Sequence, residues 1–149
     1  MSTRWTPHAT VATIVELNGR FLMIEEYAHG ISPVFNQPAG HIEENESIVN
    51  ASKRETLEES GWHVEPVGLV GFYIFKAPND VTYHRYCLYA KALYEQPNLE
   101  LDTGIIAAHW KTLEEIELLP NLRSPLVLTS IKDYLAGKRY PLDLITELL

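Results

Sequence analysis

The amino-acid sequence predicts an α/β (α+β) domain in which a mixed β-sheet is sandwiched between α-helices. Runs that alternate in strand fashion are interleaved with stretches of good helix formers, and the chain shows no internal repeat. Two β-rich runs are joined by Asn18-Gly19, the strongest short-range signal for a two-residue hairpin turn. Residues 47–60 contain neither Gly nor Pro, and Gly61 follows where a helix C-terminal cap is expected.

The first half of the chain begins with that hairpin, which we expect to consist of residues 10–17 and 20–27. A loop with Gly30 and Pro33 then leads into a short extended segment, 34–38. The helix over residues 47–60 completes this half.

The second half starts with two long strand patterns, residues 64–75 and 81–94, which a Pro-Asn-Asp turn separates. A polar loop precedes a third, shorter strand at 105–111, and Thr112, followed by two glutamates, is typical of a helix cap. The last expected helix covers residues 125–136, with Pro at its first turn and Gly at its end.

Bulk properties indicate an ordinary globular protein. A length of 149 residues suits one domain, 1–149, and 46% hydrophobic with 21% charged residues is normal for a soluble chain. No apolar run approaches the ~18 residues of a membrane helix. Residues 1–9 lack the apolar core of a signal peptide, so we expect a cytoplasmic protein. The single Cys87 lies in a strand pattern and is interpreted as a core residue.

The net charge of −8 argues against a nucleic-acid polymer as a partner, because such binders depend on clustered Lys and Arg. The sequence marks no oligomer interface, so a monomer and a homodimer both stay open.

Three glutamates of the helix, Glu55, Glu58 and Glu59, are spaced i, i+3 and i+4 and therefore share one side of it. Like charges repel at this spacing, and the helix dipole disfavours negative charge in the last turns. A divalent cation among the oxygens would remove both penalties, and an all-oxygen site without Cys or His favours Mg²⁺ or Mn²⁺ over Zn²⁺. For three glutamates alone, a solvated acidic face is the more frequent explanation.

The residues around the three glutamates favour a metal site over a solvated acidic face. The segment 40–62 resembles the signature of the Nudix superfamily at every fixed position, and a chance match is on the order of one in a million. These positions are Gly40, Glu46, Arg54, Glu55, Glu58, Glu59 and Gly61.

The resemblance implies a Nudix fold and a role for each of these side chains. Glu55, Glu58 and Glu59 would be metal ligands, one of them able to deprotonate the attacking water. The Gly40 carbonyl would complete the metal site, while Arg54 would orient the carboxylates with Glu46 as its partner. Many family members add an acidic residue on a loop before a Trp-containing strand. Here the residues directly before Trp110 carry no carboxylate, so we expect the base on the helix, with Asp102 and Glu100 as alternatives.

Flanking segments are similar to the NudJ-like bacterial phosphatases. They are residues 36–41, 121–127 and 137–142. This similarity implies release of orthophosphate from nucleoside di- and triphosphates or from hydroxymethylpyrimidine pyrophosphate. An ADP-ribose or nucleotide-sugar pyrophosphatase is the second hypothesis. A catalytically silent nucleotide-binding domain is the third, and the complete set of carboxylates weighs against it.

Candidate substrate contacts carry less weight. Arg85 lies in an otherwise aromatic and apolar strand pattern, so it is either a phosphate ligand or a structural residue that snorkels or forms an ion pair. Arg123 precedes the last helix and could either clamp a phosphate or bond helix-end carbonyls. The amides of Asn36 and Gln37 suit a heterocycle edge.

Other side chains near these segments complete the candidates. His41 adjoins Gly40 and is expected near a phosphate. Phe35, like Tyr27 and Tyr73, could stack on a ring, although core packing is the commoner role of aromatics. The remaining histidines show no zinc-ligand spacing. They are His8, His29, His63, His84 and His109.

Overall fold

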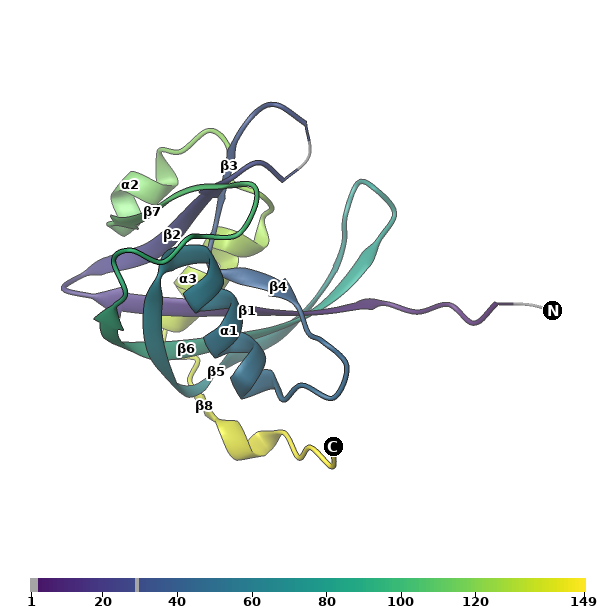
Figure 1. Ribbon diagram of the computed structural model, residues 1–149. Helices are drawn as coiled ribbons and strands as arrows, with labels where there is room; N and C mark the ends of the chain where they lie inside the picture. The colour runs from purple at the N-terminus through teal and green to yellow at the C-terminus, as the bar shows by residue number, and fades with distance from the viewer. Residues whose placement is uncertain (1–2, 29) are drawn as a thin grey trace.

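A computed structural model describes residues 3–28 and 30–149, and Figure 1 shows its helices and strands. His29 lies outside the described residues. No helix in these two ranges is long and apolar enough to cross a membrane. The elements are, in chain order, β1 (His8–Leu17), β2 (Arg20–Glu26), β3 (Val34–Asn36), β4 (Ala39–His41), α1 (Ile48–Ser60), β5 (Trp62–Lys76), β6 (Thr82–Glu95), β7 (Ile105–Lys111), α2 (Leu113–Glu117), α3 (Leu126–Leu135), β8 (Tyr140–Pro141) and the 3₁₀ turn η1 (Leu142–Leu144).

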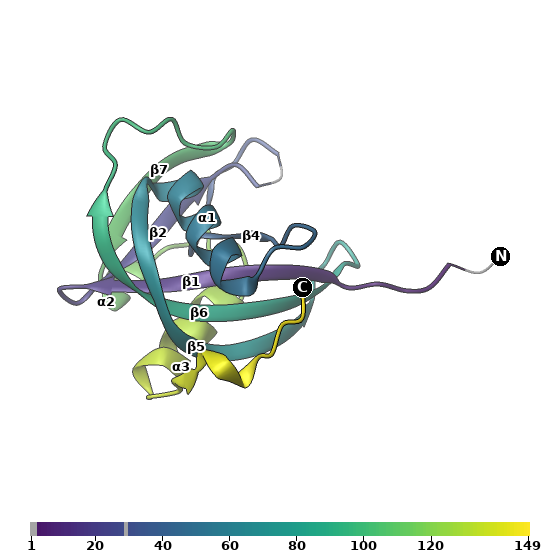
Figure 2. The same ribbon diagram turned by 60° about the horizontal axis from the view of Figure 1, so that its bottom comes forward.

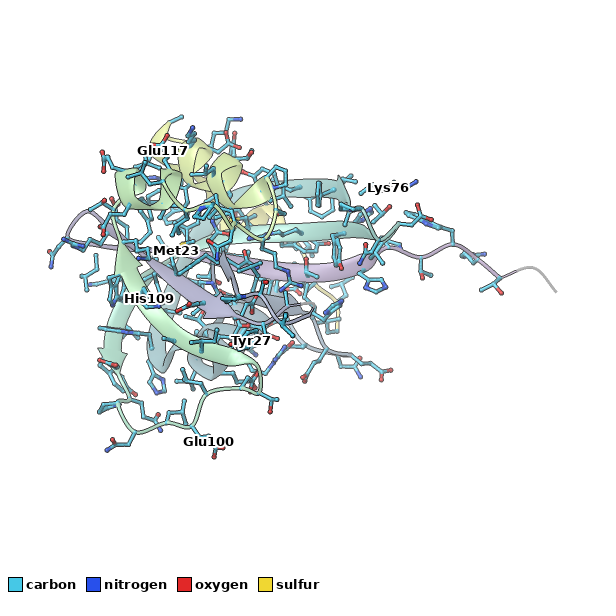
Figure 3. The ribbon with its side chains drawn as sticks, turned by 90° about the horizontal axis from the view of Figure 1, so that it is seen from above. Met23, Tyr27, Lys76, Glu100, His109 and Glu117 are labelled. Carbon is cyan, nitrogen blue, oxygen red and sulfur yellow. The ribbon has the colours of Figure 1, made fainter. Side chains whose placement is uncertain are left out.

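The strands form the mixed sheet that the sequence predicts. Their order is β3-β2-β1-β6-β5-β8, with β4 also on β1 and β7 also on β2. The pairing of β1 with β6 is parallel, whereas the neighbouring pairs β1–β2 and β5–β6 are antiparallel. Figure 3 shows β2 and β7 side by side, with Met23 paired to His109.

The hairpin of β1 and β2 separates soon after its turn. Asn18 and Gly19 both have positive φ, 53° and 76°, as a type I′ turn requires. Only Glu16 with Phe21 and Leu17 with Arg20 are in register between the two strands. Beyond these pairs β1 joins β4 and β6, while β2 joins β3 and β7, so the two groups of strands diverge away from the turn.

Helices cover both faces of the sheet, which confirms the predicted sandwich (Figure 2). Successive residues of β1 point to opposite faces. Val11 packs with Ile48 of α1, whereas Ala12 packs in the cluster that contains Val127 and Ile131 of α3.

Helix α1 has the ends that the sequence predicts. The Ser47 side chain accepts a hydrogen bond from the Asn50 backbone N–H, and Gly61 adopts the left-handed conformation with φ of 77°. These caps fix the length of the helix that carries the glutamates.

The segment after α3 contains structure that the sequence patterns do not predict. Strand β8 pairs with β5 at Gly68 and Leu69. A side chain at residue 68 would meet the Tyr140 carbonyl oxygen at 2.7 Å, so glycine permits this pairing. A two-residue strand that includes a proline gives no periodicity to detect.

Beyond β8 the chain reaches the amino end of α1. Leu142 and Ile145 pack against the cluster around Ile48. The Glu147 carboxylate accepts a hydrogen bond of 3.0 Å from the Ile48 backbone N–H. Because α1 has no acidic residue in its first turn, Glu147 supplies the negative charge that a helix N-terminus favours.

Replacing Glu147 should therefore destabilise the fold. We expect Glu147→Ala to lower the free energy of unfolding by about 1 kcal/mol, as loss of a cap does. Glu147→Gln should cost a few tenths, because the amide oxygen still accepts while the charge is lost. Urea unfolding measures both, with Asp143→Asn, an exposed carboxylate of the same segment, as control. Equal effects of Glu147→Ala and Asp143→Asn would contradict this role.

Candidate active site

Three carboxylates gather at the carboxyl-terminal part of α1. Glu55, Glu58 and Asp102 each offer an oxygen that lies within 4.8 Å of the other two. Asp102 comes from the loop between β6 and β7, and its backbone N–H donates to the Glu58 carbonyl at 3.0 Å. The residues directly before Trp110 carry no carboxylate, yet the loop folds back and brings Asp102, one of the two alternatives from the sequence, to the helix. Glu100 lies in the outer part of that loop (Figure 3).

Glu59 is held apart from these three. One of its carboxylate oxygens accepts a 2.8 Å hydrogen bond from the Ala39 backbone N–H, which ties α1 to β4. The side chain is buried, with 7% of its surface exposed. Burial, and then the charges of Glu26, Glu55 and Asp102, raise its pKa to about 9, although the bond from Ala39 opposes the shift.

The other helix carboxylates are also perturbed. Burial raises the pKa of Glu55 to about 6 against the opposing effect of Arg54. The pKa of Glu58 is raised by burial and by Asp102. The charged forms of these groups are thus disfavoured in the protein without a bound cation.

Arg54 connects the carboxylates. Its Nε and Nη2 donate to the two oxygens of Glu46 at 2.6 and 2.9 Å. Its Nη1 donates to Glu55 at 2.9 Å and to Glu58 at 3.2 Å. The hydrogen bond from Arg54 lowers the pKa of Glu46. The guanidinium therefore holds two carboxylates of the cluster in fixed directions, anchored by a bidentate pair.

Gly40 lies against this cluster. A side chain at residue 40 would collide with the Glu55 carboxyl group, so glycine is needed where β4 passes α1. The Arg54 Nη2 also donates to the His41 carbonyl oxygen at 3.1 Å. The backbone of β4 is thus fixed directly beside Glu55.

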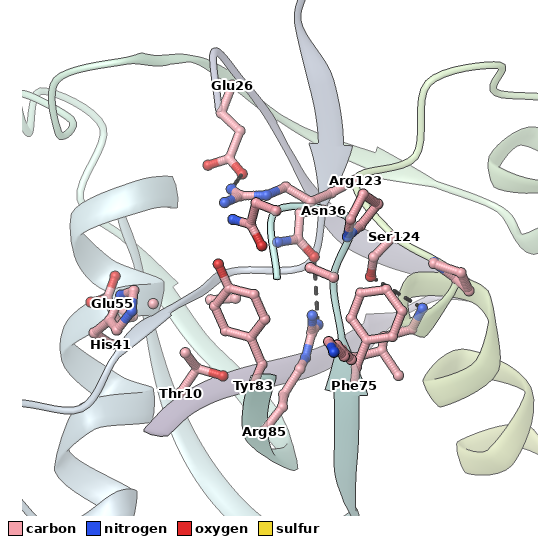
Figure 4. Close-up of a pocket in the computed structure, with 18 of the residues that line it drawn as sticks. Thr10, Glu26, Asn36, His41, Glu55, Phe75, Tyr83, Arg85, Arg123 and Ser124 are labelled. Carbon is pink, nitrogen blue, oxygen red and sulfur yellow. Dashed lines mark hydrogen bonds and ion pairs between the residues drawn. The ribbon is translucent and has the colours of Figure 1, made fainter. Parts of the chain in front are cut away.

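An open cavity of about 1230 Å³ adjoins the cluster, where β1 and β2 have diverged (Figure 4). Every layer of the fold contributes to its wall. The lining residues are Thr10, Glu26, Asn36, Ala39, Gly40, His41, Glu43, Glu55, Glu59, residues 75–80, Tyr83, Arg85 and residues 123–126.

Arg85 is an unusual member of this wall. It is 7% exposed, and its Nη2 donates to Gln37 Oε1 at 2.6 Å and more weakly to Asn36 Oδ1 at 3.4 Å. Its Nε is buried without a partner. Among the described residues no carboxylate pairs with Arg85. The structural ion pair considered from the sequence is therefore not found there.

The wall contains one further arginine and one lysine, and each of them is paired with a carboxylate. Arg123 donates to Glu26 at 2.6 Å, and Lys76 lies 3.1 Å from Asp80. Arg123 thus makes an ion pair inside the cavity, whereas the sequence analysis considered bonds to helix-end carbonyls.

Two expected substrate contacts do not match the structure. Gln37 is 2% exposed; its amide nitrogen donates to the Val127 carbonyl and its oxygen accepts from Arg85, so no amide edge faces the cavity. Phe35 belongs to the hydrophobic core and lies beside His109. In both cases the side chain faces α3 and the core, a direction that local sequence does not specify.

Of the remaining candidate residues, some line the cavity and others make contacts within the protein. Asn36 and His41 line the cavity, and the His41 ring lies 3.1 Å from that of His8, measured between nitrogens. Tyr73 instead donates to Asp133 at 2.7 Å. The sequence analysis missed Phe75 and Tyr83, which line the cavity from β5 and β6. The cross-strand register of that hairpin would have paired them.

Carboxylates held by an arginine beside a wide cavity suit a metal-assisted hydrolase of phosphate compounds. The model of the NUDIX domain matches residues 6–128, so the chain belongs to the Nudix hydrolase family and cleaves phosphoanhydrides.

Relatives and solved structures agree with this assignment. The chain is 39% identical to "Phosphatase NudJ" of Escherichia coli (strain K12), covering 95% of this chain and 92% of that one. A Nudix hydrolase structure from Nitrosomonas europaea has a TM-score of 0.94 and 41% identity, covering 96% and 98% of the two chains. An ADP-ribose pyrophosphatase from Streptococcus suis, at 16% identity, TM-score 0.69 and coverage of 91% and 96%, shares the fold.

Replacing the ionisable carboxyl group of Glu59 should stabilise the metal-free protein at pH values above the ordinary pKa of a glutamate. Because its pKa is about 9 in the folded chain and near 4.5 in the reference state, the folded state holds a proton that the unfolded state loses between these values. The stability of the native protein should therefore fall as pH rises through that window, and Glu59→Gln should lose this dependence.

Unfolding in urea with EDTA at pH 5 and pH 8 measures the difference. We expect Glu59→Gln to exceed the native protein in stability at pH 8 by more than at pH 5. Glu44→Gln, at an exposed position, is the control. Parallel pH profiles of the native protein and Glu59→Gln would refute the assignment.

Proposed function

We propose that the protein is a magnesium-dependent hydrolase that releases orthophosphate from nucleoside di- and triphosphates or from hydroxymethylpyrimidine pyrophosphate. The observation that carries this proposal is the cluster of Glu55, Glu58 and Asp102 beside a cavity whose buried Arg85 lacks an anionic partner among the described residues. The likeness to phosphatases over 95% of the chain supports the choice of product.

The donor atoms fit a hard divalent cation. Three carboxylates within 4.8 Å and raised pKa values of Glu55 and Glu58 describe a site that gains from added positive charge. All these donors are oxygens, which suits Mg²⁺ or Mn²⁺. We propose Glu55, Glu58, Glu59 and the Gly40 carbonyl as ligands, with Asp102 as an addition from the structure. A bound ion would supply positive charge to the phosphoanhydride oxygens.

The side chains around the cluster have complementary tasks in this proposal. Arg54 keeps Glu55 and Glu58 in place through its contacts at 2.9 and 3.2 Å. A carboxylate takes the proton of the attacking water. We assign this step to a glutamate of α1, and Asp102 is the alternative because it lies in the same cluster.

The cavity wall would hold the rest of the phosphate chain. A buried guanidinium without a carboxylate is costly, and an anionic ligand would offset that cost. Arg85 is therefore our candidate for attracting phosphate charge. Arg123, His41 and Asn36 line the same space and are candidates for further contacts.

The size of the cavity also suits the second hypothesis, an ADP-ribose or nucleotide-sugar pyrophosphatase. About 1230 Å³ would accommodate a dinucleotide-sized ligand such as ADP-ribose or a nucleotide sugar. Catalytic silence, as a nucleotide-binding domain, is disfavoured because the acidic cluster is complete.

The products separate the two hydrolytic reactions. With Mg²⁺ and a nucleoside triphosphate, we expect orthophosphate as the first product. A substrate panel with separate detection of orthophosphate, pyrophosphate and monophosphates measures this. AMP formed from ADP-ribose with comparable efficiency would favour the alternative reaction.

Charge-neutral variants test the acidic cluster. We expect Glu58→Gln to lower kcat by about 10²–10⁴-fold with little change in folding, because a ligand or proton acceptor is lost. Asp102→Asn should cost less if the base belongs to α1, and as much if Asp102 is the base. Glu114→Gln, on α2 and outside the cavity wall, should retain full activity. Unchanged turnover of Glu58→Gln would exclude our assignment.

A further inference from the structure

The cavity has two chemically different ends. Glu55, Glu59 and Gly40 form one end. The opposite wall comes from the β5–β6 hairpin and the start of α3, where apolar side chains lie among polar ones such as Asn79 and Ser124. Its lining residues include Phe75, Ala77, Pro78, Pro125 and Leu126. Figure 4 shows Phe75 beside Ser124, with Tyr83 between Phe75 and the side of the view where Glu55 and His41 lie.

Two aromatic rings mark the approach to this apolar end. Phe75 and Tyr83 are direct partners in the β5–β6 register, so their side chains leave the same face of the sheet. Both are partly buried and line the cavity. The Tyr83 ring packs edge-on against His8, with 5.8 Å between centroids. Two aromatic rings thus lie in the wall of a cavity that Glu55 and Glu59 also line.

The hairpin that carries Phe75 is well ordered by its own contacts. The Ala77 N–H donates to the Val81 carbonyl at 2.9 Å, and the Asp80 N–H donates to the Ala77 carbonyl at 3.0 Å. Lys76 and Asp80 form an ion pair across the turn. These contacts define the backbone that carries Phe75, and an ordered backbone favours a preorganised binding surface.

We propose that this end of the cavity is a ring subsite, in which a planar aromatic heterocycle of the substrate stacks on Phe75. The inference rests on the proposed function and deepens it. It assigns ring binding to Phe75, with Tyr83 separating the ring from the phosphates. Phe75 thus takes the ring-stacking role that the sequence suggested for Phe35, whose side chain lies in the core.

The chemistry of the wall selects the substrate class. Stacking on an aromatic side chain suits planar heterocycles in general, because every such ring has a π-face. The subsite therefore fits a di- or triphosphate that carries a nucleobase or another pyrimidine ring, in preference to inorganic polyphosphate.

The test compares a substrate that has a ring with one that lacks it. We would measure kcat and KM with Mg²⁺ for GTP, and for inorganic tripolyphosphate as substrate or as competitive inhibitor. We expect Phe75→Ala to lower kcat/KM for GTP about tenfold or more, mainly through KM, since loss of a stacked base has effects of this size. The value for tripolyphosphate should change less than twofold. Phe75→Tyr should retain GTP selectivity, and Phe75→Leu, apolar without a ring, should lose most of it.

Phe72→Ala is the matched control, because Phe72 is an exposed aromatic residue of the same strand outside the cavity wall. It should leave both substrates unchanged. If Phe75→Ala fails to fold by circular dichroism, the comparison of Phe75→Leu with Phe75→Tyr decides. Equal losses for GTP and tripolyphosphate, or no loss for either, would overturn the ring subsite. A native protein that releases no orthophosphate from any of these compounds would instead overturn the proposed function.

Discussion

The early separation of β1 from β2 is the constraint on which the site depends. Two residue pairs next to the Asn18-Gly19 turn hold the strands together, and beyond them each strand satisfies its backbone groups with other partners. The space between the two groups of strands consequently widens away from the turn. Thr10 near the start of β1 and Glu26 at the end of β2 line the cavity that results. A fully paired hairpin would leave no room there.

Acidic and basic side chains occupy different parts of the wall of this opening. Arg54 compensates Glu46 and orients two further carboxylates, while Glu59 is buried against the backbone of β4. Arg85 lies on another part of the wall, supported by an amide of Gln37. Burial of ionisable groups such as Glu59 and Arg85 costs free energy in the empty protein. Stability and readiness to bind a charged ligand are thus opposed in the same residues.

Local sequence predicted the elements well because their signals are local. The hairpin follows from Asn18-Gly19, and the caps of α1 follow from its flanking residues. The helical spacing of the glutamates also required no tertiary information. Asp102 was not placed because a loop folds back to bring it there, and the burial of Gln37 depends on α3, ninety positions away in sequence. Whether an aromatic residue faces a cavity or the core is likewise decided by packing between elements, as Phe75 and Phe35 illustrate.

The contact between Glu147 and the amino end of α1 links residues 99 positions apart. During synthesis on the ribosome, α1 therefore emerges long before the carboxylate that completes its first turn. Until Glu147 has been synthesised, Ser47 is the local cap of this helix, and the glutamates of the helix are already close together. Final ordering of the helix is then a late event, tied to the closure of a long loop.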